Sequence, residues 1–363
     1  MLCFNCIYDF KSEVALSIDG IPNIEGNRPV FKPKINSTQR SKTDIYNDPS
    51  YLSLYERSDR KLFEYEYTEG DKKITFLSLK TPIPNVPGFC FSETLFDLES
   101  PFGYSGPSCN TSSKPFLIKA FASYRSFCQS EKVICEFLRF NPLNPLVKFP
   151  ELFDFFIEDR RLVSVNLYEG KERRWSGYTK KARNIIRRAN EILEFDPVGV
   201  SVDEFLCLYN ETMRDNEAAE GYYFDKRFVC KLLDDDRVRL YGVRHKGLLV
   251  SSGIFFFGDK QAFYHLSGNH LELKSLNGNY VLLDKAFDEA TKIGVDQFIL
   301  GGGRSNAAND QLFKFKSKFS KHTVPFFVGG LTFMPSELAK IREQMTLRDH
   351  KALQTKKFQF YRH

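Results

Sequence analysis

The chain has 363 residues, of which 42% are hydrophobic and 27% charged, and its formal net charge at pH 7 is +6. This length and composition exclude a disordered protein and predict large hydrophobic cores divided between two domains. Because the net charge is small, bulk attraction to nucleic acid is excluded, DNA is not an expected partner, and any site for an anion must be local.

Targeting and metal-binding signals are weak in this sequence. No stretch approaches the roughly 18 uninterrupted apolar residues of a membrane span, and the N-terminus has no basic region followed by an apolar run. The protein is therefore expected in the cytoplasm, with its eight cysteines mostly reduced and buried. Cys3 and Cys6 have the spacing of a metal knuckle, but no second pair of Cys or His completes four ligands, so no metal is expected.

The first half of the chain is predicted to form one domain after an irregular start. Residues 1–60 are rich in Pro, Ser and Asn and are expected to be a surface segment without regular structure. Residues 61–170 are expected to hold strands at Lys73–Leu79, Phe89–Phe96, Val133–Phe140 and Leu162–Leu167. The spacing i, i+4, i+7 and i+11 predicts a helix before the third strand, with Leu117, Phe121, Tyr124 and Cys128 on its buried face.

A basic helix is predicted to connect the two halves. It lies within residues 171–195, at about Thr179–Leu193, and its apolar stripe is Ala182, Ile185, Ile186, Ala189 and Leu193. After it, Ser201 and Glu204 have capping-box spacing, in which each side chain satisfies the other's free backbone N–H. This pattern predicts a helix over Val202–Arg214.

The second half, residues 196–336, is predicted to repeat the order of the first. After a short helix from Asp225, turn signals separate three strands at Arg239–Arg244, Leu248–Phe257 and Ala262–Ser267. A helix with the stripe Tyr280, Leu283, Phe287 and Ala290 ends at Gly294 and leads into strand Gln297–Leu300. A helix at Asp310–Phe319, a strand at Phe326–Gly330 and a basic C-terminal helix and tail, residues 337–363, complete the prediction. The repeated order indicates two similar tandem domains.

Several classes of enzyme are excluded by the motifs that the sequence lacks. It has no Gly-x-Ser-x-Gly elbow, no P-loop and no zincin pattern. Gly301-Gly302-Gly303 lacks the spacing that holds a dinucleotide at a helix N-terminus. Dehydrogenase and kinase functions are therefore not expected.

Lys316 is the candidate catalytic residue. A fixed cation beside a reacting carbonyl stabilises the negative charge that builds on its oxygen, by roughly 3 to 4 kcal/mol. The helix that carries it has Leu312, Phe315 and Phe319 on the opposite face, so Lys316 is expected to point into a cleft. The alternative is that Lys316, like its neighbours, only solvates the helix.

Three further residues are candidates for binding substrate, each with a structural alternative. Arg304 follows the glycines at a strand end, where its planar guanidinium could bind phosphate or carboxylate, although the glycines could also form a plain turn. Arg139 ends an apolar strand and needs either a bound anion or a buried carboxylate. His265 is either a packed core histidine or a donor to substrate.

The basic helix is the candidate for contact with an anion. Lys180, Lys181, Arg183 and Arg187 lie close together, and Arg183 and Arg187 stand four residues apart on one helical face. Their mild repulsion would be relieved by RNA phosphates or a nucleotide diphosphate. A solvated connecting face is the alternative.

Three blocks of sequence, in this order, resemble the Fem-type transferases and their relatives in surface-polysaccharide gene clusters. They are Phe102–Pro107, Tyr209–Arg214 with Tyr222–Phe224, and Gly301–Gly330. The resemblance covers about Thr81–Gly330 and implies an α/β fold of mixed sheets in two tandem GNAT-like domains. It also implies transfer of an amino acid from aminoacyl-tRNA to an amine on a cell-wall precursor, without metal, cofactor or covalent intermediate. Many members carry a long helical arm in the second domain, and here only the basic helix at Thr179–Leu193 could take its place in a tRNA contact.

The same resemblance implies roles for individual residues. Phe315-Lys316 matches the family's Phe-Lys motif, and Tyr104 lies in a loop that in the family helps to line the acceptor cleft, with a plain turn as the alternative. Apart from the resemblance, Tyr223 follows the acidic run Glu217–Glu220 and is a candidate for positioning the acceptor amine. That amine must lose a proton, either to a phosphate of the substrate or to one of four carboxylates, Asp215, Glu217, Glu220 and Asp310. The expected partner is a nucleotide- or lipid-linked glycan precursor, with tRNA as donor and a peripheral membrane contact left open.

Two other functions remain as alternatives. An acyl-CoA-dependent N-acetyltransferase acting on an amino sugar needs a glycine-rich pyrophosphate cradle before the helix that follows the central strand. The matching stretch, Leu273–Asn279, has one glycine and no matching spacing, which disfavours this function. The third possibility is a tandem domain that binds a glycan or RNA without catalysis.

Overall fold

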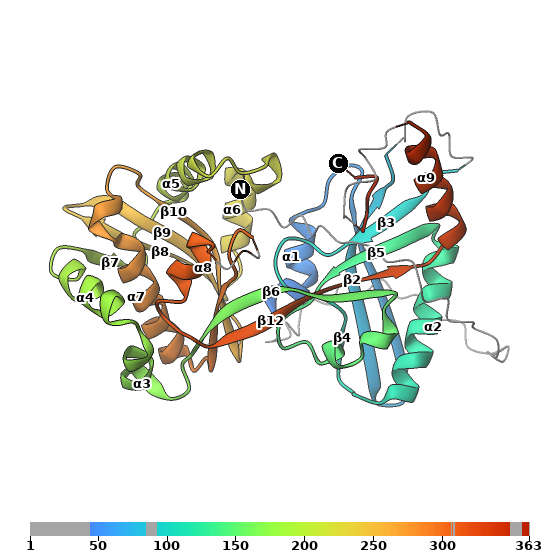
Figure 1. Cartoon of the computed structure of the whole chain (residues 1–363), viewed down its shortest axis with the longest axis horizontal. Coiled ribbons are helices and arrows are strands. Elements are labelled where there is room, and N and C mark those ends of the chain that lie inside the picture. The colour runs from blue at the N-terminus through green and yellow to red at the C-terminus, as the bar shows by residue number, and fades with distance from the viewer. Residues whose placement is uncertain (1–43, 85–92, 306, 308, 349–357, 363) are drawn as a thin grey trace.

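The computed structural model describes residues 44–84, 93–305, 307, 309–348 and 358–362. Its strands form one sheet in the order β1-β2-β3-β5-β12-β6-β11-β10-β9-β8-β7, with β4 attached to β2. Figure 1 shows two lobes joined across the middle of this sheet. The strands are β1 (Lys61–Glu69), β2 (Lys72–Pro82), β3 (Phe96–Glu99), β4 (Ser108–Cys109), β5 (Val133–Arg139), β6 (Phe155–Asn166), β7 (Glu194–Asp196), β8 (Val238–His245), β9 (Leu248–Phe257), β10 (Gln261–Asn269), β11 (Gln297–Gly301) and β12 (Thr323–Thr332).

The two lobes repeat one local topology. In the first, β1, β2 and β3 form an antiparallel meander, and helix α2 (Lys114–Ser130) leads to β5, which lies parallel to β3. In the second, β8, β9 and β10 form the meander, and α7 (Gly278–Ile293) leads to β11, parallel to β10. The predicted mixed α/β fold with two tandem GNAT-like units is confirmed in this arrangement. Of the strand predicted at Phe89–Phe96, residues 89–92 lie outside the described residues.

The lobes exchange their last strands. β6 follows β5 in the chain but pairs antiparallel with β11 of the second lobe, and β12 follows β11 but pairs antiparallel with β5 of the first. β6 and β12 also pair with each other, and Figure 1 shows them crossing between the lobes. Because both strands run from one lobe into the other, the predicted boundaries at 61–170 and 196–336 remain a prediction.

A short segment before β1 is ordered, where the sequence had indicated irregular structure. A 3-10 helix η1 (Ile45–Asn47) and helix α1 (Pro49–Ser53) begin at the side-chain caps Asp44 and Asp48. We call residues 44–54 the strap. Its apolar side chains, Ile45, Tyr46, Tyr51 and Leu52, are buried in a cluster that includes strands of both lobes.

The predicted basic connector consists of two helices, α3 (Gly170–Gly177) and α4 (Lys180–Ala189), and the second packs on α7. The chain continues through α5 (Val202–Asp215), η4 (Glu220–Tyr222) and α6 (Lys226–Leu233). Near the end, η5 (Lys274–Leu276) precedes α7, α8 (Gln311–Lys316) precedes β12, and α9 (Pro335–Arg348) follows it. Within the described part of the chain, no helix combines the length and the apolar character needed to cross a membrane.

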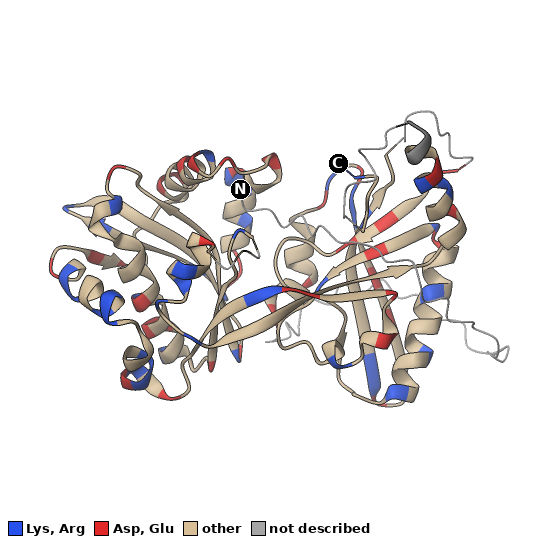
Figure 2. Cartoon of the chain, in the orientation of Figure 1, with Lys and Arg blue, Asp and Glu red and all other residues tan. Residues whose placement is uncertain are grey.

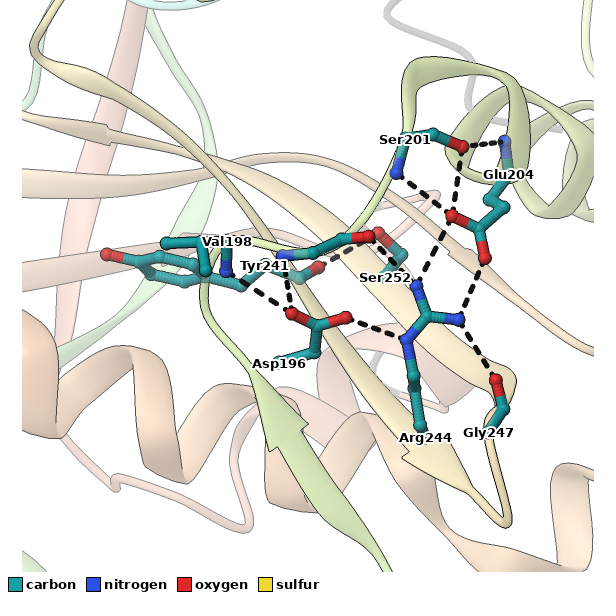
Figure 3. Close-up of polar contacts among 9 residues, drawn as sticks. Asp196, Val198, Ser201, Glu204, Tyr241, Arg244, Gly247 and Ser252 are labelled. Carbon is teal, nitrogen blue, oxygen red and sulfur yellow. Dashed lines mark hydrogen bonds and ion pairs between the residues drawn. The ribbon is translucent and has the colours of Figure 1, made fainter.

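Helix α5 confirms the predicted capping box. Ser201 Oγ accepts from Glu204 N at 3.2 Å, and the Glu204 carboxylate accepts from Ser201 N at 3.0 Å. Figure 3 shows how Arg244 extends this cap by donating to Glu204 and, at 2.7 Å, to Asp196. The cap therefore ties the start of α5 to strands β7 and β8.

Replacing Ser201 with Ala is expected to lower the free energy of unfolding by about 1 kcal/mol, because Glu204 N loses its acceptor. Urea unfolding would measure the change. Ser176→Ala is the control, since within the described part of the chain the exposed hydroxyl of Ser176 bonds only to a carbonyl of its own helix. Equal losses in the two variants would contradict a special role for the cap.

Candidate active site

Lys316 is buried at the junction of α8 and β11. Its side chain is 7% exposed, and Nζ donates a hydrogen bond of 2.8 Å to the carbonyl oxygen of Gly302. That oxygen is the one hydrogen-bond acceptor of Nζ among the described residues, so a protonated Lys316 keeps two donors for a ligand. The alternative in which Lys316 only solvates its helix is wrong, whereas its neighbour Lys314 is exposed. The catalytic role of Lys316 stays a prediction.

Burial lowers the pKa of Lys316 to about 7, an effect that Asp310 opposes and Arg160 reinforces. A buried ammonium loses its hydration, so its charged form is costly unless an anion lies beside it. Lys316 is therefore poised between its charged and neutral forms near neutral pH. A negatively charged ligand at this position would favour the cation.

Gly301 makes room for two side chains at once. Its φ of +82° is strained for any residue with a Cβ, and a Cβ there would stand 3.0 Å from Tyr104 Oη and 3.1 Å from Lys316 Nζ. Tyr104, from the first lobe, is therefore close to Lys316, from the second. Its ring is buried and stacks on Phe263 rather than standing free in a turn.

Arg160 is a second cation near Lys316. It comes from β6, bonds Asp159 at 2.5 Å and donates to Gly303 O at 3.2 Å. Both side chains of this pair are almost completely buried. The glycine-rich end of β11 is thus held between a lysine of one lobe and an arginine on the strand that crosses from the other.

Asp310 organises the loop that follows these glycines. Its carboxylate accepts hydrogen bonds from the backbone N–H groups of Arg304, Ser305 and Phe313. Partial burial alone would raise the pKa of Asp310, but these bonds hold that pKa below its usual value. Asp310 is therefore a loop anchor and a poor candidate for the base. Arg304 itself is exposed and donates to the side chain of Asn216 at the end of α5.

The strap and His265 fill the space between the lobes next to Tyr104. Tyr46 Oη lies 3.0 Å from His265 Nδ1, and its ring meets the Tyr104 ring edge-on at 5.5 Å. His265 stacks on Phe256 at 4.1 Å, and burial lowers its pKa to about 3, so the ring is neutral. Its Nε2 is buried without a partner among the described residues. His265 is thus a packed histidine with one nitrogen free for a further hydrogen bond.

Arg139 and Tyr223 lie together in a pocket of about 640 Å³ between the lobes. Arg139 pairs with the Glu99 carboxylate at 2.8 Å and donates to Ser100 O at 2.6 Å. The sequence left either a bound anion or a buried carboxylate open as the partner of Arg139, and the structure shows a carboxylate, that of Glu99. Burial alone would raise the pKa of Glu99, but Arg139 and Arg60 hold it below its usual value.

This pocket and Lys316 are linked by one loop. Phe102 lines the pocket, and Tyr104, two residues further on, reaches Gly301 and Lys316. Because only one residue separates them, the Cα atoms of Phe102 and Tyr104 can be no more than about 7 Å apart. The pocket itself is not lined by Lys316, Tyr104, His265 or Arg304. Of the carboxylates predicted as bases, Glu220 lines it, whereas Asp215 pairs with Lys274 on the surface.

The four cations predicted to contact an anion have different environments. Arg183 is occupied by backbone carbonyls at the end of α3, with its shortest bond, 2.6 Å, to Tyr178 O. Arg187 lies over the Trp175 ring. Lys180 and Lys181 are exposed and line a surface hollow. The predicted RNA contact thus rests on the lysines, and it stays a prediction.

Metal ligands do not converge in the described part of the chain, where no group of three or more His, Cys, Asp or Glu side chains could hold an ion. Cys3 and Cys6 lie outside the described residues. Arg160 and Tyr46 are neighbours of the site that were not predicted from the sequence. The charged run Asp159-Arg160-Arg161 inside the otherwise largely apolar strand β6 could have drawn attention to Arg160, but no local pattern marks Tyr46.

No protein-family model matches the chain, and no curated protein matches its sequence. Its fold is similar to that of FemX, with a TM-score of 0.64 and 11% identity over 82% of this chain and 94% of that one. It is also similar to L-PGS from Bacillus licheniformis (TM-score 0.51, 13% identity, 83% and 92% covered) and to the C-terminal domain of a putative lysylphosphatidylglycerol synthetase from Agrobacterium fabrum (0.50, 13%, 83% and 92%). At such identities the likeness concerns the fold alone. The chain has the Fem-type fold of two GNAT-like lobes, as its sequence motifs had predicted.

Proposed function

We propose that the protein is an acyltransferase whose reaction takes place where the two lobes meet. In its specific form, the proposal is that an amino acid passes from aminoacyl-tRNA to an amine on a nucleotide- or lipid-linked glycan precursor. The observation that carries it is Lys316, a buried lysine with one acceptor among the described residues, beside the glycine-rich end of β11. The likeness of the fold to FemX supports the same reaction class.

The chemistry needs few groups. The acceptor amine attacks the ester carbonyl of the donor, a C–N bond forms, and the C–O bond to the tRNA ribose breaks. Negative charge builds on the carbonyl oxygen, where the Lys316 ammonium would stabilise it. The proton of the amine goes to the departing ribose oxygen, through a substrate phosphate or a carboxylate such as Glu220. No cofactor is required by this sequence of steps.

The pocket is proposed to hold the acceptor. Arginine and tyrosine side chains line it, including Arg57, Arg227 and Tyr223, and these suit phosphate and sugar. The loop from Phe102 to Tyr104 would bring the acceptor amine to Lys316. Tyr223, which is 40% exposed, is free to contact a ligand there.

The rival donor, acyl-CoA, finds little support at the start of α7. A Cβ on Gly278 would lie 2.8 Å from Val250 Cγ1, so this glycine serves close packing on β9 rather than an open cradle. Asn277, before it, adopts a left-handed conformation, and its side chain bonds Ser275 O. Neither feature presents a row of free backbone N–H groups to a pyrophosphate.

Thermal shift with separate ligands tests the proposal. Charged tRNA and UDP-linked amino sugars are expected to raise the melting temperature, because ligands that bind only the folded state stabilise it. Stabilisation by acetyl-CoA without stabilisation by charged tRNA would favour the acyl-CoA-dependent acetyltransferase. If Lys316→Ala binds these ligands and wild type transfers nothing, the protein is a binding module.

The pH dependence of kcat/KM should report the charge on Lys316. With its pKa near 7 in the free protein, the ammonium is lost as pH rises above that value. If the cation is the active form, kcat/KM rises up to about pH 7 and then levels off, because above that pH the loss of the Lys316 ammonium offsets the gain in deprotonated acceptor amine. A bound anion raises the pKa of Lys316. Since kcat reports the protein with substrate bound, kcat is expected to fall only at a pH above the Lys316 pKa of the free protein. A kcat/KM that keeps rising to pH 9 would contradict a catalytic cation.

A further inference from the structure

The outer face of α4 carries a surface of alternating cationic and apolar side chains. We call it the α4 patch, and its members are Lys180, Lys181, Ile185, Arg188, Ile192 and Leu248. Helical backbone bonds continue beyond α4, from Asn190 N to Ile186 O and from Leu193 N to Ala189 O. The spacing i, i+4, i+7 and i+11 therefore places the four members from Lys181 to Ile192 along one stripe.

Leu248 joins this stripe from the neighbouring hairpin. His245 Nδ1 lies 3.0 Å from Ile192 O, and His245 is the register partner of Leu248 across β8 and β9. Ile192 and Leu248 are 49% and 53% exposed, which is high for large aliphatic side chains on two neighbouring segments. The patch thus has an apolar end at the edge of the second lobe.

The cations of the patch are not neutralised by the protein. Lys180, Lys181 and Arg188 form no ion pair or side-chain hydrogen bond with any residue that the structure describes, and they line a surface hollow of about 540 Å³ together with Asn184 and Ile185. The exposed Lys246 lies in the hairpin turn beside Leu248, and Glu191 and Glu194 are the acids next to the stripe in sequence. Figure 2 shows Lys and Arg on α4 and at the hairpin tip, on the same edge of the molecule.

We propose that the α4 patch docks on the surface of an anionic phospholipid bilayer. Lys180, Lys181 and Arg188 would bind headgroup phosphates, and Ile192 and Leu248 would enter the boundary between headgroups and acyl chains. RNA phosphates could also pair with the cations, but RNA would leave the exposed aliphatic side chains without a role. The combination of both kinds of side chain favours the lipid surface.

This proposal goes beyond the transfer reaction and is tested apart from it. A bilayer contact would bring the protein to a lipid-linked acceptor, but vesicle binding is measured without donor or acceptor. Failure to bind vesicles would leave the acyltransferase proposal intact, and failure of acyl transfer would leave the docking result intact.

The test is cosedimentation of the full-length protein with phosphatidylcholine vesicles, with and without about one third phosphatidylglycerol. Binding is expected only with phosphatidylglycerol, and it should weaken as salt rises. Each lost cation costs roughly fivefold in partitioning, so Lys181→Glu/Arg188→Glu should bind at least tenfold more weakly. Ile192→Ser/Leu248→Ser should bind about threefold or more weakly.

Matched variants serve as controls. Lys61→Glu/Lys321→Glu reverses two exposed lysines elsewhere, and Ile118→Ser/Ile293→Ser removes two isoleucines of similar exposure, 52% and 54%. Both should bind vesicles like wild type. The proposal is overturned if phosphatidylglycerol has no effect, or if Ile192→Ser/Leu248→Ser binds normally. It is also overturned if the protein binds tRNA but not vesicles, and Lys181→Glu/Arg188→Glu abolishes the tRNA binding.

Discussion

Replacing Lys316 with Met is expected to lower turnover at least a hundredfold without lowering the melting temperature. Turnover falls because the developing charge on the carbonyl oxygen loses its cation, an effect of roughly 3 to 4 kcal/mol. Stability is kept because the buried ammonium is costly, as the low pKa of Lys316 indicates, and Met fills nearly the same volume. Steady-state transfer rates and thermal unfolding of the same preparations would measure both effects.

The control is Lys314→Met, on the same helix but exposed to solvent. It should transfer at the rate of wild type. The proposed role of Lys316 fails if Lys316→Met keeps a near-normal rate. A loss of rate accompanied by a large drop in melting temperature would also count against it, because the loss would then reflect folding.

Replacing Tyr46 with Ala is expected to cost about 3 to 5 kcal/mol of unfolding free energy, in the range measured for large aromatic side chains. Tyr46 is 1% exposed, and its ring contacts Tyr51, Tyr104, Phe256 and Phe263 at centroid distances of 5.0 to 5.5 Å. Its removal leaves a cavity between the lobes and takes a hydrogen bond from His265. Urea unfolding would give the difference.

Two companion variants separate the contributions. Tyr46→Phe keeps the ring and loses only the hydroxyl bond to His265, so it should cost about 1 kcal/mol. Tyr168→Ala, at an 82% exposed tyrosine, should cost almost nothing. If Tyr46→Ala is no more destabilised than Tyr168→Ala, the strap is not part of the folded core.

Elements whose signals lie within a few residues were predicted well from the sequence. Helix α5 begins at the predicted capping box, and α7 ends at Gly294, which adopts the left-handed conformation of a C-cap. The meander of β8, β9 and β10 was also placed within a few residues. In each case the deciding contacts are local, so a single sequence contains them.

Features that depend on distant partners were not visible. Tyr46 is buried by partners far along the chain, among them His265, which is 219 residues away. The exchange of β6 and β12 likewise depends on pairing between residues far apart in the chain. At the site, helical spacing predicted Lys316 opposite a buried apolar face, whereas the structure buries Lys316 itself and leaves Leu312 and Phe315 partly exposed. The contact of Lys316 with Gly302 O, which lies in another segment, could not be seen in the spacing. Arg183 donates to backbone carbonyls at the end of α3. Because the sequence does not show where α3 ends, Arg183 was predicted to be a free cation.

The central claim is that an acyl group is transferred at the junction of the lobes with the help of Lys316. A single-turnover experiment tests it most directly, with aminoacyl-tRNA and acyl-CoA offered separately to the protein and to Lys316→Met in the presence of a lipid- or UDP-linked amino sugar. The account predicts transfer of the amino acid from aminoacyl-tRNA by the wild-type protein, and at least a hundredfold slower transfer by the variant. Equal transfer rates in the two proteins would contradict it.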